Sequence, residues 1–289
     1  MSGAAAGAAR VRRIFHATAV VHDVHASVEQ LERLLGATVL SRAEGEAFGV
    51  EMRRAMVWIG DNLVEVIEPV GESAFSGFLS RFGGGLNSLG LQVGDAAAAE
   101  KWLGAHGVEV AVRYGEDMFA TRTGSTAGLA LQFTSQWVHD DPRKGNAPPP
   151  PSESAIVTVD RLAFIAALVE EPVAAAGALA QLFGSTATIL DVSSAPGPEA
   201  VVGIGDCTLA LYRRAGAADG AAWGVPHERP RFLALGVHVS DADSAAAALE
   251  EHGATRVAQH AHGWLVELGP GGLPIIVGPA LLPGDPRSG

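Results

Sequence analysis

Five short segments in the first half of the chain recur in the same order in the second half. The pairs are IGDNLVEVIEP at 59–69 with IGDCTLALYRR at 204–214, LGLQVGDAA at 89–97 with LGVHVSDAD at 235–243, AHGVEVA at 105–111 with EHGATRVA at 251–258, LLGAT at 34–38 with LFGST at 182–186, and GLALQF at 128–133 with GLPIIV at 272–277. The order is kept, and the spacing drifts by only a few residues. This pattern indicates a tandem duplication and predicts two similar modules.

A proline-rich segment separates the two copies. Residues 138–155 read VHDDPRKGNAPPPPSESA, and the proline run favours an extended, semi-rigid linker over a helix or a central strand. We therefore expect a first module at 10–137 and a second at 156–283. The small, basic residues 1–9 are expected to form a disordered leader.

Each module contains the same order of sequence patterns twice. In the first module, an alternating apolar segment at 15–21 precedes a helical pattern that ends at Gly36, and two strand patterns joined by a Gly-Asp turn follow. The order restarts with a strand pattern at 87–93 and with Asp95 as the N-cap of a second helix. The chain is therefore predicted to be α+β, with four such units and mostly antiparallel strands.

Composition narrows the classes of partner and the location. The net charge of −12 does not suit a nucleic-acid partner, which needs clustered Lys and Arg. No apolar run is long enough to span a bilayer and no signal-peptide core follows the N-terminal residues, so we expect a cytoplasmic protein with no membrane partner. The single cysteine, Cys207, rules out an internal disulfide and a Cys-rich zinc site. A small-molecule substrate or ligand and a monomer or homodimer are the remaining expectations.

The modules resemble the vicinal oxygen chelate superfamily, which includes glyoxalases, bleomycin-resistance proteins and extradiol dioxygenases. The resemblance rests on loose patterns carried by LLGAT, IGDNLVEVIEP and LGLQVGD, and it covers nearly the whole chain outside the leader and the linker. It implies an α+β fold of tandem modules, each made of two βαβββ units. The mostly antiparallel sheet of each module would curve around a cavity.

The resemblance also implies a set of metal ligands in the first module. Members of the family typically place His, Glu, His and Glu on the first and last strands of the two units. His16 and Glu65 match the first two positions, whereas Ser88 stands at the third and Gln132 at the fourth. His16, Glu65 and Gln132 would then hold one divalent cation such as Mn, Fe, Co, Ni or Zn.

The residues alone leave another interpretation open for each of the two matching positions. His16 could be a hydrogen-bonded core histidine, and Glu65 could be paired with Arg53 or Arg54 from the preceding strand. Together, at positions that the fold would bring side by side, they favour a ligand pocket with or without a metal.

The second module departs from the ligand pattern at all four positions. Arg161, Ala210, Ala234 and Ile276 stand at the corresponding places, and none of them is a usual metal ligand. An ionised carboxylate that faces a closed cavity is costly unless it is paired or metal-bound, whereas the methyl group of Ala210 simply packs. We therefore expect the first module to be active and the second to be degenerate and structural.

Strand alternation predicts further residues of the pocket. His22 shares the face of His16, and Gln92 shares the face of Ser88. Together with Trp58, the residues His22, Ser88 and Gln92 make up the predicted ligand-binding set.

Two functions are consistent with these residues. The first is an enzyme that acts on a small oxygenated organic substrate as an isomerase, a lyase or an epimerase, with or without a metal, and with His16 and Glu65 as catalytic residues. The alternative is a metal-free protein that binds or sequesters a small molecule, as bleomycin-resistance proteins do. Its cavity could use Trp58, Phe119 and Phe133 as aromatic walls.

Overall fold

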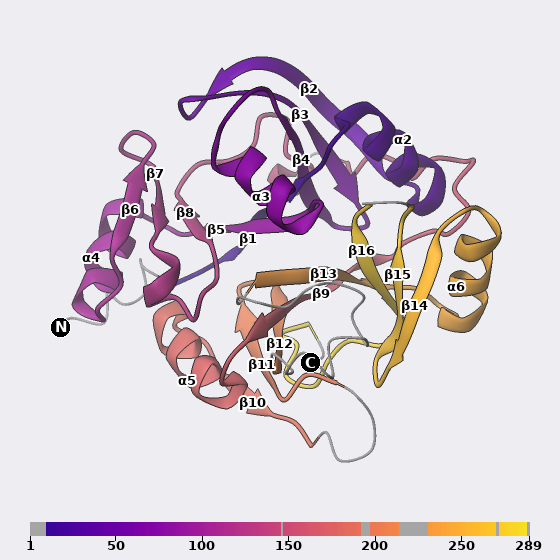
Figure 1. The fold of residues 1–289 in the computed structure, drawn as a ribbon. Helices are drawn as coiled ribbons and strands as arrows, with labels where there is room; N and C mark the ends of the chain where they lie inside the picture. The colour runs from indigo at the N-terminus through magenta and orange to yellow at the C-terminus, as the bar shows by residue number, and fades with distance from the viewer. Residues whose placement is uncertain (1–9, 146, 192–196, 214–230, 270–271, 288–289) are drawn as a thin grey trace.

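The computed structural model describes residues 10–145, 147–191, 197–213, 231–269 and 272–287, and within them the strands form two eight-stranded sheets (Figure 1). The predicted leader at 1–9 lies outside the described residues. The first sheet and its helices are β1 (Arg13–Val20), α2 (Val24–Leu35), β2 (Thr38–Ala47), β3 (Val50–Ile59), β4 (Asn62–Pro69), α3 (Ala74–Phe82), β5 (Gly85–Gln92), α4 (Ala96–Ala105), β6 (Val110–Arg113), β7 (Met118–Thr121) and β8 (Leu131–Thr134). The second sheet and its helices are β9 (Arg161–Val169), α5 (Pro172–Phe183), β10 (Ala187–Ile189), β11 (Ala200–Ile204), β12 (Cys207–Arg213), β13 (Arg231–His238), α6 (Ala242–Glu251), β14 (Thr255–His260), β15 (Gly263–Glu267) and β16 (Pro274–Gly278).

The two sheets have the same topology. The strand order is β2-β3-β4-β1-β5-β8-β7-β6 in the first and β10-β11-β12-β9-β13-β16-β15-β14 in the second. Within each sheet, the two pairs that join the first and last strands of a unit are parallel, and the other pairs are antiparallel. Each sheet is thus two βαβββ units joined through their first strands, and the predicted α+β fold class is confirmed.

The first unit shows why its sequence forms these elements. The Asp23 side chain accepts a hydrogen bond from the backbone N–H of Ala26 and begins α2, and Gly36 ends that helix in the left-handed conformation. The prediction did not name strand β2, whose residues are mostly polar, or helix α3, which begins at the Ser73 capping box.

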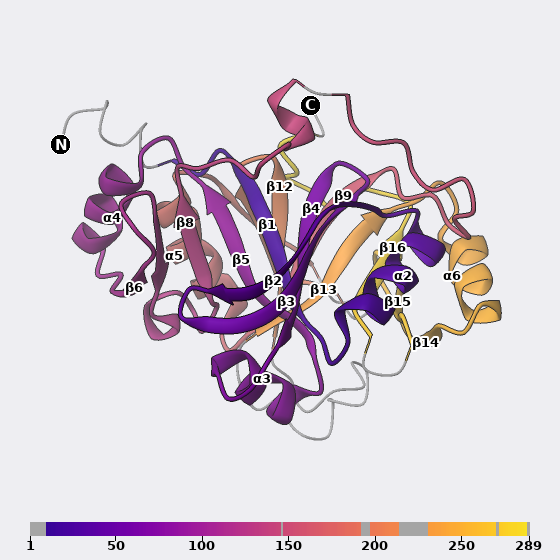
Figure 2. The same cartoon turned by 90° about the horizontal axis from the view of Figure 1, so that it is seen from above.

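The modules pack through one shared apolar core, to which both sheets and helices α2, α4, α5 and α6 contribute. Strands β5 and β13 are in contact, α2 lies beside α6, and α4 lies beside α5 (Figures 1 and 2). The Arg33 guanidinium donates to the carbonyl of His252 at 3.3 Å, and the Trp102 indole donates to the carbonyl of Leu182 at 3.2 Å. The duplicated helices therefore meet in corresponding pairs.

The repeated Ile-Gly-Asp turns explain why that sequence is kept in both copies. Each turn contacts the first strand of the other module: Asp61 accepts from the Leu162 N–H at 2.8 Å, and Asp206 accepts from the Ile14 N–H at 3.0 Å. The preceding glycines have positive φ, 61° at Gly60 and 71° at Gly205. A Cβ at Gly60 would lie 2.7 Å from Arg161, and a Cβ at Gly205 would lie 2.4 Å from Arg12 and Arg13, so both turns need glycine.

The linker packs against the first module for part of its length. The N–H of Ser152 donates to the carbonyl of Gly36 just after α2, and the Thr38 hydroxyl donates to the carbonyl of Pro150. Helix η2 (Pro142–Lys144) lies within the predicted linker, yet it folds against the first sheet. The domain limits at 10–137 and 156–283 stay proposals.

Limited proteolysis tests how the two modules are held together. Cleavage within 147–151 is expected to give two fragments that co-elute in gel filtration, because the shared core and the reciprocal Asp contacts do not depend on the linker. Fragments that separate while each stays folded would contradict a shared core.

Protonation of the two turn carboxyls tests their burial. Desolvation raises the pKa of both Asp61 and Asp206, so the folded state binds protons more tightly than the unfolded state. Their contribution to the free energy of unfolding is therefore full at low pH and falls as pH rises from about 4 through the folded-state pKa. Chemical denaturation of Asp61→Asn/Asp206→Asn is expected to show the variant gaining on the wild type between pH 4 and 7. A difference that moves the other way would show that the ionised carboxylates stabilise the fold.

Candidate functional site

The strand register brings the four sequence-predicted ligand positions onto one face of the first sheet. Glu65 is opposite Thr18, which is opposite Ser88 on the other side. In the next row, His16 is opposite Gly90, and Gly90 is opposite Gln132. The internal repeat of the module relates the two rows. Each row begins on the last strand of one unit, β4 or β8, and crosses the first strands of both units, β1 and β5.

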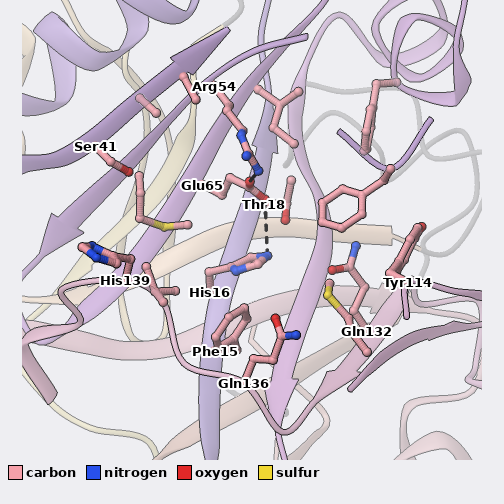
Figure 3. Close-up of a pocket in the computed structure, with 18 residues that line it drawn as sticks. Phe15, His16, Thr18, Ser41, Arg54, Glu65, Tyr114, Gln132, Gln136 and His139 are labelled. Atoms are coloured by element: carbon pink, nitrogen blue, oxygen red, sulfur yellow. Dashed lines mark ion pairs between the residues drawn. The ribbon is translucent and has the colours of Figure 1, made fainter. Parts of the chain in front are cut away.

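This face forms the floor of a cavity of about 280 Å³ (Figure 3). The cavity is lined by polar and charged side chains at its floor and by aromatic and apolar ones around them. The lining residues are Phe15, His16, Thr18, Ser41, Ala43, Phe48, Arg54, Ala55, Met56, Glu65, Ile67, Phe75, Tyr114, Met118, Gln132, Gln136, Val138 and His139. Such a concave, mainly apolar site with a few convergent polar groups suits a small organic ligand.

Three charged or titratable side chains meet at the floor. His16 Nε2 lies 3.4 Å from Glu65 Oε2, and Arg54 Nη1 lies 3.7 Å from Glu65 Oε1 (Figure 3). Burial lowers the pKa of His16; the neighbouring Glu65 opposes this shift, while Arg143 and Arg54 add to it. The imidazole is therefore neutral at neutral pH, beside a carboxylate that also contacts a guanidinium.

Several buried polar atoms at this face have no hydrogen-bond partner among the described residues. They are both ring nitrogens of His16, the hydroxyl of Thr18 and the hydroxyl of Ser88. Buried polar groups are normally hydrogen-bonded, and unpaired ones cost free energy. Those of His16 and Thr18 belong to residues that line the cavity, so an oxygen-rich ligand there would satisfy them.

The expected pairing of Glu65 is settled in part. Arg54 contacts Glu65, whereas Arg53 binds Glu44 and Glu68 on the surface instead. Glu65 therefore lines the cavity and also forms a 3.7 Å ion pair with Arg54. The pocket role and the arginine pairing, which the sequence left open as alternatives, are both present.

The structure separates the predicted ligand-binding residues from the cavity. Ser88 is buried beside Thr18 but does not line the cavity, and Trp58 is buried in β3 beyond Met56. His22 is exposed, because β1 ends at Val20 and strand alternation does not extend to it.

Gln92 has an indirect relation to the site. It is buried, and its side-chain amide donates to the carbonyl of Gln136 at 2.8 Å, which holds a loop that lines the cavity. Phe119 and Phe133, considered as aromatic walls, stack on each other at 5.4 Å within the core. Gln132 does line the cavity.

Sequence reasoning missed the aromatic residues that do line the cavity. Phe48 is at the tip of the β2–β3 hairpin and packs edge-on against Tyr114 with ring centroids 4.6 Å apart, and Phe75 comes from α3. Phe48 is 51% exposed. Phe48 and Tyr114 lie in turns, and Phe75 lies in a helix. Strand alternation applies only to strand residues, so it could not predict that these three side chains line the cavity.

The corresponding face of the second sheet is filled by apolar side chains. Ala210, Ala166 and Ala234 form one row, and Phe164, Gly236 and Ile276 form the other. These residues except Gly236 belong to an apolar cluster with Ala163, Leu168, Val201, Tyr212, Leu233, Leu265 and Leu282.

One sequence assignment in the second module was wrong. Phe164, and not Arg161, stands at the place of His16, because Phe164 is opposite Gly236 as His16 is opposite Gly90. Arg161 begins β9, as Arg13 begins β1. The Phe164 ring takes the space over Gly236, where an added Cβ would lie 2.5 Å from it.

The donor atoms at the floor do not fit a resident divalent cation as they stand. His16 and Glu65 are the only strong donors of the predicted set, Gln132 offers a neutral amide, and the Arg54 guanidinium already compensates Glu65. Among the described residues, no three His, Cys, Asp or Glu side chains come together in a way that could hold a metal. Metal binding by His16, Glu65 and Gln132 stays a prediction of the sequence.

Two eight-stranded sheets of βαβββ units, one of them with a polar-floored cavity, have the fold that the resemblance to the vicinal oxygen chelate superfamily implied. The sequence pattern of the Glyoxalase/Bleomycin resistance protein/Dioxygenase superfamily matches residues 15–124. The match covers most of the first module and none of the second. Comparison with curated proteins finds no match.

Solved structures share the fold at low sequence identity. A mutant of 4-hydroxymandelate synthase from Streptomyces coelicolor is 14% identical, with 95% of each chain covered and a TM-score of 0.65. Methylmalonyl-CoA epimerase from Mycobacterium tuberculosis is 18% identical over 43% of this chain and 87% of its own, with a TM-score of 0.39. A methylmalonyl-CoA epimerase in complex with methylmalonyl-CoA and ammonium is 22% identical over 43% of this chain and 93% of its own, with a TM-score of 0.39.

Substitution of Glu65 separates a ligand role from a structural one. Glu65→Ala is expected to change the free energy of unfolding by less than about 1 kcal/mol, because the neutral His16 needs no anion and the half-exposed Arg54 can turn to water. The neighbouring Val64→Ala, which faces the core, is the matched control and is expected to cost roughly 2 kcal/mol. An equal loss in both variants would make Glu65 a structural residue.

Proposed function

We propose that the first module is an enzyme site that removes and returns a proton on a small, oxygenated, anionic substrate with an apolar body. The observation that carries this proposal is the buried neutral imidazole of His16, 3.4 Å from the Glu65 carboxylate on the floor of a cavity. Many isomerases, epimerases and lyases that act beside a carbonyl group begin by removing a proton from the adjacent carbon, so this site supports that set of reactions.

His16 is the proposed base. A base must be unprotonated before it acts, and burial keeps its imidazole neutral at neutral pH. When it accepts a proton, the adjacent Glu65 carboxylate stabilises the imidazolium. Glu65 would therefore orient and stabilise the base, and it would share a second charge interaction with Arg54.

Arg54 and the polar floor favour negative charge on the substrate. The Arg54 guanidinium lines the cavity and contacts Glu65 at only 3.7 Å, so it has further N–H groups to donate to a carboxylate or an enolate oxygen. The Thr18 hydroxyl and the amide of Gln132 add neutral polar groups at the floor. Phe15, Phe48 and the other aromatic walls would contact the apolar body.

A metal-free binding or sequestering function is the second candidate. Four aromatic rings line the cavity, those of Phe15, Phe48, Phe75 and Tyr114, and Phe48 is exposed at its edge. Such walls would hold an aromatic compound without any chemistry.

Among the described residues, no helix is both long and apolar enough to cross a bilayer. A cytoplasmic location and a monomeric or homodimeric state stay predictions of the sequence.

Deuterium exchange tests the proposed proton transfer directly. Small 2-oxo and 2-methyl carboxylates and thioesters, incubated with the full chain in D₂O, are followed by proton NMR at the carbon next to the carbonyl. The wild type is expected to exchange one of these compounds, His16→Asn to abolish the exchange, and Glu65→Gln to slow it by roughly 10²-fold or more. Binding of such compounds without exchange would favour the sequestering function.

Substitution of Gln132 tests the metal prediction. If a divalent ion binds between His16 and Glu65, Gln132→Glu is expected to tighten its binding, because an anionic donor attracts a cation more strongly than an amide does. In a metal-free pocket the same change places a second carboxylate near Glu65 and lowers the melting temperature. Calorimetric titration of both proteins with Mn, Co, Ni and Zn, with melts in parallel, separates the outcomes. Tight binding by the wild type would contradict a metal-free site.

A further inference from the structure

Two consecutive residues of β1, Phe15 and His16, both line the cavity, although neighbouring side chains of a regular strand point to opposite faces. The register explains this: Ile14 is opposite Leu91 and His16 is opposite Gly90, so Phe15 is the extra residue of a β-bulge. A bulge interrupts the ladder and re-aims side chains. The direction of His16 therefore depends on how this bulge is held.

Arg143 of helix η2 holds the bulge from one side. Its guanidinium donates to the carbonyl of Ile14 at 2.7 Å and to the carbonyl of Phe15 at 3.0 Å. The Asp141 carboxylate fixes the guanidinium through two further hydrogen bonds, at 2.9 and 2.8 Å, and both side chains are buried. A planar, pre-oriented guanidinium is suited to two carbonyls at once.

The second module holds the same bulge from the other side. Asp206, in its Ile-Gly-Asp turn, accepts from the N–H of Ile14 at 3.0 Å. The backbone before His16 is thus fixed at an N–H and at two successive carbonyls by groups that are not in its own sheet.

The second module repeats this arrangement around a residue with no chemical role. Arg287 donates to the carbonyls of Leu162 and Ala163 at 2.9 Å each, and Asp61 accepts from the Leu162 N–H. Ala163 is the extra residue there, and both it and Phe164 enter the apolar cluster. The contacts of Arg287 and Asp61 with the bulge at Ala163 therefore serve as an internal control for those of Arg143 and Asp206 with the bulge at Phe15.

We propose that Arg143, supported by Asp141 and by Asp206 of the second module, is a positioning residue that fixes the bulge at Phe15 and thereby aims His16 into the cavity. Neither Arg143 nor Asp206 lines the cavity, and both bind the backbone of β1, while Arg143 also acts on the His16 imidazole through its charge. The second module, whose own face is filled, completes the site of the first. That this positioning matters for proton transfer rests on the proposed function, whereas the positioning of His16 by Arg143 does not.

The test compares Arg143→Gln with Arg287→Gln by NMR on the full chain labelled with ¹⁵N. Amide hydrogen exchange is measured at Phe15 and His16 and at Ala163 and Phe164, and the imidazole signals of His16 are recorded at a pH where the ring is neutral in every variant, so that loss of the Arg143 charge does not change its protonation. Arg143→Gln is expected to speed exchange at Phe15 and His16 by roughly tenfold or more and to shift or split the His16 imidazole signals. Arg287→Gln is expected to speed exchange only in β9 and to leave the His16 signals as in the wild type.

Two further variants keep the comparison decisive. Arg143→Lys, which keeps the charge but offers no planar pair of donors, is expected to restore the His16 signals only in part. If Arg143→Gln does not fold, Asp206→Asn replaces it and Asp61→Asn becomes the control. Unchanged His16 signals in folded Arg143→Gln, or equal changes in the two modules for both variants, would overturn the proposal. A failed deuterium-exchange assay with the expected NMR changes would overturn the proposed function and leave the positioning role intact.

Discussion

The structure depends on a reciprocal contact in which each module presents an Ile-Gly-Asp turn to the first strand of the other. The carboxylates of Asp61 and Asp206 accept backbone N–H groups across the interface, and Gly60 and Gly205 allow the approach. A side chain at either glycine would overlap the partner backbone, so this sequence is restricted in both copies. The two sheets are thereby placed with their central strands in contact, which leaves the opposite face of each sheet free for other uses.

The two sheets have the same strand order, but the free face of each sheet carries different side chains. In the first sheet the row beside Gly90 carries His16 and Gln132, and a cavity lies above it. In the second sheet Phe164 covers the equivalent Gly236, and the face becomes part of an apolar cluster. The methyl group in place of a carboxylate at the second copy follows from this filling, because an ionised group there would have no polar partner or solvent.

Much of the fold and the centre of the site could be predicted from sequence. The repeat and the helix caps predict the two modules, and the family resemblance implies the positions of His16, Glu65 and Gln132, which the strand register brings onto one face. Strand alternation adds which neighbours share that face, and it holds along regular strands. The same rule failed where the backbone is irregular or the strand ends. It could not find Phe15, which the bulge turns into the cavity, and it extended to His22, which lies past the end of β1.

Long-range contacts account for the remaining differences. The aromatic walls come from a hairpin tip, from α3 and from the β6–β7 turn, and nothing in their local sequence indicates that they meet. Arg143 lies in a segment that composition marks as a linker, yet its guanidinium is buried beneath the site. A residue whose role is to bind distant backbone carbonyls carries no periodic pattern, so sequence reasoning has no signal for it.

A crystallographic fragment screen with small aromatic and aliphatic carboxylates tests the central claim, that one module keeps a ligand site and the other has filled it. The account predicts fragments over the first sheet, with a carboxylate within hydrogen-bond distance of Arg54 or His16 and the apolar part against the aromatic walls. It predicts none at the equivalent face of the second sheet. Fragments bound over the second sheet, or none near His16 in well-soaked crystals, would contradict it.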